Sequence, residues 1–166
     1  MRILLILNTD AGSQAGAVPE YEGLIEAYYL FSDAGMEVVL AAEGGGSATE
    51  SDRSVLDVDA PPAIRRFTAD RRAREVMNDL VDLATVCADD FDAALCLDSR
   101  TFGQQPSVKG HADSLIGKLL AATKPVAVIS TRPTSAEAKN GLLVIGHTAK
   151  ASLLAARALL GAVGVR

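Results

Sequence analysis

Polar residues with catalytic or ligand-binding side chains follow three apolar stretches that are typical of buried strands. They occupy 8–13 after the first stretch, 98–102 after the third and 130–133 after the fourth. In open α/β sheets, ligands bind at the carboxyl ends of the strands, where the connecting loops converge. The sequence therefore predicts one site assembled from these three segments.

Five residues of these segments have side chains that suit ligand binding: Asp10, Ser99, Arg100, Thr131 and Arg132. Guanidinium groups from two loops would hold a carboxylate or phosphate through paired, charge-assisted hydrogen bonds. In an equally weighted alternative, Arg100 pairs with Asp98 or Glu22 inside the molecule and fills the cavity. For Asp10, a turn-capping role after the strand competes with ligand binding.

Ser130 is a candidate catalytic residue, and a serine nucleophile needs an adjacent general base, usually a histidine held by a carboxylate. The chain has two histidines, His111 before a predicted helix and His147 after a predicted strand. A surface or capping role is favoured for both over the role of a triad base.

Carboxylates offer a second catalytic route. Asp98 follows the third apolar stretch, and Glu22 and Glu26 belong to the first predicted helix. A carboxylate beside a polar substrate suffices for acid or base catalysis. A hydratase, lyase or cyclase that uses one of these groups is therefore a further hypothesis.

Composition limits the classes of function. Hydrophobic residues make up 49% of the 166 residues and charged residues 22%, as expected for a globular protein. The net charge of −5 and the absence of a basic run argue against nucleic-acid binding. No apolar run approaches the roughly 18 residues that span a bilayer, and MRILLILNTDAG is better explained as a first strand than as a signal peptide. We expect a cytoplasmic protein, and the abundance of Ala, Gly and Arg suggests a bacterial source.

The two cysteines, Cys87 and Cys96, do not form a disulfide framework or a metal signature. Cys87 lies near the end of a predicted helix and Cys96 within an apolar stretch, so we expect two buried thiols that act as small hydrophobic residues. No His, Cys and Asp cluster has metal-ligand spacing. The sequence thus predicts no metal and no cofactor.

Strand and helix patterns alternate along the chain. Apolar runs predict strands at 2–7, 36–42, 91–97, 126–130 and 142–145. Helical spacing predicts a first helix that ends at Gly35 and further helices at 70–86, 112–122 and 150–163. This alternation implies right-handed βαβ crossovers. We predict a single α/β domain over 1–166, with a mostly parallel, flavodoxin-like sheet and helices on both faces.

Three stretches resemble, in order and spacing, the PfpI/ThiJ superfamily, which has the class I glutamine amidotransferase-like fold. They are EAYYLFSDAGMEVVLAAEGGG from Glu26, DDFDAALCLDSR from Asp89 and TKPVAVISTRP from Thr123. The resemblance covers nearly the whole chain and is greatest to the chaperone and glyoxalase III-like branch. It implies that dimers are common among related proteins.

The resemblance also implies a cysteine nucleophile where this chain has Ser130. The A-x-C-H-G-P turn of that branch reads V-I-S-T-R-P here, and the glycine-rich PGGHG-like turn reads L-D-S-R-T from Leu97. A family glutamate twelve residues before the helix-ending glycine falls on Gly23 in the preferred alignment, whereas a one-residue shift would place Glu22 there. Each departure removes part of the family's thiol chemistry.

These observations lead to one main hypothesis and two alternatives. The chain is identified as a divergent PfpI/ThiJ-like protein that binds a small polar metabolite, anionic or carbonyl-bearing, without cysteine-dependent glyoxalase, deglycase or peptidase activity. The first alternative is the acid/base enzyme described above. The second is a structural protein or homodimer whose pocket has closed.

Overall fold

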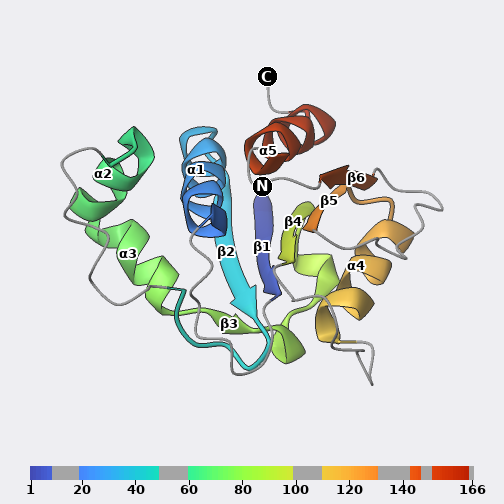
Figure 1. Cartoon of the computed structure of the whole chain (residues 1–166). Helices are drawn as coiled ribbons and strands as arrows, with labels where there is room; N and C mark the ends of the chain where they lie inside the picture. Colours follow the sequence, from blue (N-terminus) through green and yellow to red (C-terminus); the bar gives the residue numbers. More distant parts are fainter. Residues whose placement is uncertain (9–18, 49–59, 99–109, 131–142, 147–150, 165–166) are drawn as a thin grey trace.

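The computed structural model describes residues 1–8, 19–48, 60–98, 110–130, 143–146 and 151–164 (Figure 1). Six parallel strands form one sheet in the order β3-β2-β1-β4-β5-β6. The strands are β1 (Arg2–Asn8), β2 (Glu37–Ala42), β3 (Val81–Asp82), β4 (Ala93–Asp98), β5 (Val126–Ser130) and β6 (Leu143–Gly146). The predicted α/β class with a parallel sheet is confirmed.

Helices cover both faces of this sheet. They are α1 (Pro19–Asp33), α2 (Pro62–Ala69), α3 (Arg71–Asn78), α4 (His111–Ala121) and α5 (Ala151–Ala162), with 3₁₀ turns η1 (Leu83–Thr85) and η2 (Ala88–Asp90). Helices α1 and α5 pack side by side on one face, whereas α4 packs on the other with η1 and η2 (Figure 1). Among the described residues, no helix is long and apolar enough to cross a bilayer.

Strand β1 shows why the sequence forms a sheet with two covered faces. Its residues are apolar from Ile3 to Leu7, as in parallel strands buried on both sides. Ile3 and Leu5 belong to the core under α1 and α5, and Leu4 and Ile6 belong to the core under α4. All four are fully buried. The two-residue alternation of the strand thus supplies both cores.

Helix α1 ends as the sequence predicts. Gly35 adopts a left-handed conformation with φ of +76°. Its N–H donates to the carbonyl of Ser32, and the N–H of Met36 donates to the carbonyl of Phe31, both at 3.0 Å. This pair of bonds is the Schellman arrangement, which turns the chain directly into β2.

The helix predicted over 70–86 begins as predicted but ends about halfway along the predicted range. Helix α3 ends at Asn78, Leu80 forms an antiparallel bridge with Gly46, and the next two residues join the sheet as β3. The apolar spacing of Leu80 and Leu83 fits a helix, but the open edge of β2 supplies backbone partners that end it. The preceding helix α2 was not predicted, although Pro62 is favourable at a first helical position.

The early end of α3 also overturns one prediction about the thiols. Cys87 lies between η1 and η2 and is exposed, whereas Cys96 is buried in β4 as predicted. Helical burial of Cys87 required the helix to continue to 86. The chain therefore has one buried and one exposed thiol.

Candidate functional site

The carboxyl ends of three neighbouring strands carry polar residues in one row. Asp98 is paired in register with Asn8 of β1 on one side and with Ser130 of β5 on the other. The strand order reverses direction between β1 and β4, which is where open α/β sheets form their ligand crevices. Two of the predicted catalytic residues, Asp98 and Ser130, are therefore adjacent.

Ser130 is buried at the end of β5, with 3% of its surface exposed. It follows Val126 and Val128 at two-residue steps and thus belongs to the sheet face that α4 covers. In the described part of the chain, Ser152 of α5 is the other buried polar residue. A hydroxyl at this position has the rigid support that a binding group requires.

Helix α1 carries the two predicted glutamates at its amino-terminal half. Glu22 is exposed, Glu26 is half-buried, and Gly23 between them is buried. Gly23, which has no side chain, is thus on the buried face of α1 together with other buried residues such as Leu24 and Ala27. Which of Glu22 and Gly23 corresponds to the family glutamate stays a prediction.

All five predicted ligand-binding residues lie outside the part of the chain that the structure describes. They are Asp10, Ser99, Arg100, Thr131 and Arg132. All five lie in segments that follow β1, β4 or β5 in the sequence. Their roles, like those of Asp98, Ser130, Glu22 and Glu26, stay predictions.

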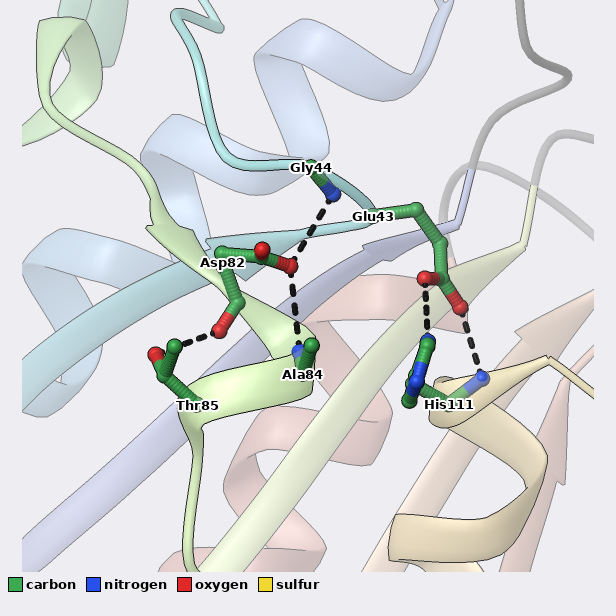
Figure 2. A network of polar contacts seen from close by, with 6 residues as sticks. All are labelled: Glu43, Gly44, Asp82, Ala84, Thr85 and His111. Carbon is green, nitrogen blue, oxygen red and sulfur yellow. Dashed lines mark hydrogen bonds and ion pairs between the residues drawn. The ribbon is translucent and has the colours of Figure 1, made fainter.

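A carboxylate and a histidine that are distant in the sequence are in contact at the same carboxyl-terminal end of the sheet (Figure 2). Glu43 directly follows β2, and His111 is the first residue of α4. Glu43 Oε1 accepts a hydrogen bond from the backbone N–H of His111 at 2.7 Å, and Glu43 Oε2 lies 2.8 Å from His111 Nδ1. The histidine is at a helix start, as predicted, but the sequence did not indicate its partner.

Glu43 takes the place of a local helix cap. The residue before α4 is Gly110, which makes no side-chain capping bond. A Cβ atom at Gly110 would lie 3.1 Å from Glu43 Oε1, so glycine leaves room for the carboxylate. A negative group at this position also interacts favourably with the helix dipole.

Asp82 holds the turn that carries Glu43 (Figure 2). Its Oδ1 accepts hydrogen bonds from the N–H groups of Gly44 at 3.1 Å and Ala84 at 3.0 Å. Thr85 Oγ1 donates to the carbonyl of Asp82 at 2.8 Å. The turn after β2 is thereby tied to β3 and η1, which limits the movement of Glu43.

Neither thiol lies at the end of β5. Cys96 lies mid-strand, in register with Val128, and 1% of its surface is exposed. Cys87 adjoins Ala88, whose carbonyl accepts a hydrogen bond from Lys124 Nζ at 2.9 Å, on the amino-terminal side of β5. Since these are the two cysteines of the chain, no thiol occupies the position of Ser130.

Comparison with known proteins gives structural likeness alone. No family model matches the sequence, and no curated protein matches it significantly. The Rapid Encystment Protein 24 KDa (REP24) of Francisella tularensis has a TM-score of 0.67 and 13% identity over 98% of this chain and 99% of its own. DJ-1beta of Drosophila melanogaster has a TM-score of 0.50 and 15% identity over 99% and 91%. The chain therefore has the fold of these two proteins.

Proposed function

We propose that this protein is a divergent member of the PfpI/ThiJ superfamily that binds a small polar metabolite at the carboxyl ends of β1, β4 and β5. The ligand carries an anionic or carbonyl group. The protein lacks the cysteine-dependent glyoxalase, deglycase and peptidase activities of the superfamily. It acts in the cytoplasm, and the family resemblance favours a homodimer.

The observation that carries this proposal is the buried Ser130 in register with Asp98 at the switch point of the sheet. The rest of β5 is apolar and buried, so a polar residue at its last position is a specific exception. The position is also the one that the family resemblance assigns to the nucleophile.

Loss of the thiol argues against the family reaction. A cysteine thiolate is nucleophilic because its pKa is lowered by its surroundings, whereas a serine hydroxyl needs a positioned base. Neither Cys96 in the sheet core nor the exposed Cys87 substitutes for a thiol at the end of β5. Binding without thiol chemistry is therefore the function that these residues support best.

A thermal-shift screen tests the proposal. The compounds are small carboxylates, phosphates and carbonyl metabolites, and the proteins are wild type, Arg132→Ala and the control Arg157→Ala. Arg157 is an exposed residue of α5 and lies in none of the three site segments. A ligand that binds the native state raises the melting temperature as its concentration exceeds Kd.

We expect at least one compound to stabilise wild type and Arg157→Ala but not Arg132→Ala. If no compound shifts any of the proteins, and Arg132→Ala itself melts lower, Arg132 is an internal support and the proposal is wrong. If a compound stabilises all three equally, it binds elsewhere, and the assigned site is wrong.

A further inference from the structure

We propose that Glu43 and His111 form a proton-transfer pair at the carboxyl-terminal end of the sheet. His111 Nε2 is the general base, and Glu43 is the residue that positions and stabilises the imidazole ring. This inference adds an activity to the proposed function and rests on it for the location of the substrate.

The hydrogen bonds determine which ring nitrogen is free. A carboxylate can only accept hydrogen bonds, so His111 Nδ1 must donate to Glu43 Oε2 across their 2.8 Å contact. In the neutral ring, Nε2 is then the unprotonated nitrogen.

The pair is held on rigid elements and remains open to a substrate. Glu43 Oε1 accepts a hydrogen bond from the backbone N–H of His111, and Glu43 Oε2 contacts the ring of the same histidine. Both carboxylate oxygens are therefore held by His111. The side chain of His111 is 62% exposed, whereas that of Glu43 is 37% exposed. The base is thus accessible and its partner is more enclosed.

The backbone register places the pair beside the candidate site. Ala42 pairs with Leu7, and Leu7 pairs with Leu97, so Glu43, in the turn directly after Ala42, lies at the same end of the sheet as Asn8 and Asp98. Neighbouring strands lie about 4.8 Å apart, which puts the backbone of Ala42 roughly 10 Å from that of Leu97. A small metabolite at the switch point can span this interval.

A role in capping alone does not account for the ring contact. A cap needs one oxygen, and a Ser, Asp or Asn at 110 would supply it locally. The chain instead has Gly110 and uses a glutamate 68 positions away, whose second oxygen bonds the imidazole. The second contact orients the ring, which capping does not require.

Hydrolysis of p-nitrophenyl acetate tests the base without knowledge of the natural substrate. Water adds to the ester carbonyl while Nε2 takes one of its protons, and the carbon–oxygen bond to p-nitrophenolate then breaks. Acetic acid and p-nitrophenolate leave, acetic acid loses its proton to solvent, and the imidazolium also returns its proton to solvent. The tested proteins are wild type, His111→Gln, Glu43→Gln and His147→Gln, which removes the other histidine of the chain.

We expect the protein-dependent rate to fall roughly 100-fold or more in His111→Gln, which is the low end of general acid–base effects. His147→Gln should keep the wild-type rate. Glu43→Gln retains an oxygen that can cap α4 but not the carboxylate, so it should fold and still lose most of the rate. Equal rates in wild type and His111→Gln, or equal losses in the two histidine variants, would overturn the proposal.

A spectroscopic readout separates positioning from capping. In wild type, the nitrogen NMR signals of His111 should show a protonated Nδ1 and an unprotonated Nε2 in the neutral ring. In Glu43→Gln the protonated nitrogen should shift towards Nε2. A protonated Nε2 in neutral wild type would overturn the assignment. Thermal shifts report binding separately, so failure of the base leaves the binding proposal standing.

Discussion

At the scale of single residues, the chemistry proposed for the candidate site depends most on Ser130. This residue is buried at the end of β5, and the resemblance described above would place a cysteine there. A hydroxyl stays protonated at neutral pH, so it binds through hydrogen bonds and does not attack a carbonyl unaided. Ser130 is thus suited to recognition of a ligand.

The absence of glyoxalase activity is a residue-scale prediction. Purified wild type and Ser130→Ala should both consume methylglyoxal at the rate of a protein-free blank, because no thiolate is available at this edge. Consumption is followed by the loss of the dicarbonyl. Turnover by wild type that disappears in Ser130→Ala would contradict the prediction.

Single residues were predictable where local pattern decides their environment. The burial of Cys96 follows from the apolar stretch around it, and the structure confirms it. The exposure of Cys87 depends on where α3 ends, which local pattern misjudged. The contact between Glu43 and His111 joins residues 68 positions apart, so no local pattern could reveal it. An acidic residue directly after a parallel strand was the available signal.

At the scale of elements, a polar cluster joins α1 to α2 and α3. Arg66 Nη1 and Nη2 each lie 2.6 Å from a carboxylate oxygen of Asp33, and the guanidinium lies 3.9 Å from the centroid of the Tyr29 ring. Tyr29 donates its hydroxyl to Asp70 Oδ2 at 3.3 Å, and Asp70 Oδ1 caps α3 through the N–H of Ala73. One cluster thus orients three helices.

This cluster makes stability sensitive to alkaline pH. Burial, followed by the nearby charge of Asp70, raises the pKa of Tyr29 from 10.0 to about 12. A raised pKa means that folding favours the protonated phenol. The phenol therefore makes its full contribution to the free energy of unfolding below about pH 10, and this contribution is lost as pH rises towards 12. Urea unfolding of wild type should therefore show falling stability over this interval.

The matched variant is Tyr29→Phe, which keeps the ring under Arg66 but has no ionisable hydroxyl. Its stability should fall less steeply between pH 10 and 12 than that of wild type. Equal slopes would show that Tyr29 does not control this pH dependence.

The turn directly after β2 gives a second prediction at this scale. Gly45 has φ of +68°, and a Cβ there would lie 2.8 Å from the carbonyl oxygen of Leu80. Gly45→Ala should therefore lower the free energy of unfolding by about 1–3 kcal/mol, from backbone strain and the clash together. Denaturant unfolding measures the change.

Two other glycines serve as comparisons, one for backbone strain without a clash and one for a glycine within a helix. Gly44 has φ of +73° with nothing within 4 Å of a Cβ, so Gly44→Ala tests strain alone and should cost about 1 kcal/mol. Gly117 lies within α4 with open space around it, and Gly117→Ala should stabilise the protein by up to about 1 kcal/mol. Equal costs for Gly44→Ala and Gly45→Ala would show that the clash is unimportant.

At the scale of the whole molecule, the alternation of strands and helices predicted the sheet and both covering layers. Five strands were predicted within two residues of their observed bounds, because parallel strands buried on both faces are short, continuous apolar runs. The failure lies at the edge of the sheet, where β3 contributes two residues and Val81 is 38% exposed. So short and exposed a strand has no apolar pattern, and its pairing with β2 is decided by tertiary contacts.

The candidate site was predictable as a location but not as a set of contacts. Topology alone determines that β1, β4 and β5 end side by side at the switch point. The register that aligns Asn8, Asp98 and Ser130 could be inferred from neither their spacing nor their types. It depends on how the strands slide against each other to bury both cores.

The proposed ligand site at the carboxyl ends of β1, β4 and β5 requires that small molecules reach Ser130 in the folded protein, although only 3% of its surface is exposed. Thiol labelling of Ser130→Cys in a Cys87→Ser background tests this requirement most directly, because the remaining thiol, Cys96, is buried and serves as an internal reference. We predict one iodoacetamide adduct, at the thiol introduced by Ser130→Cys, formed more slowly than at the exposed Cys87 of wild type and slowed further by a stabilising ligand. No adduct until urea unfolds the protein would mean that the pocket is closed, and would contradict the account.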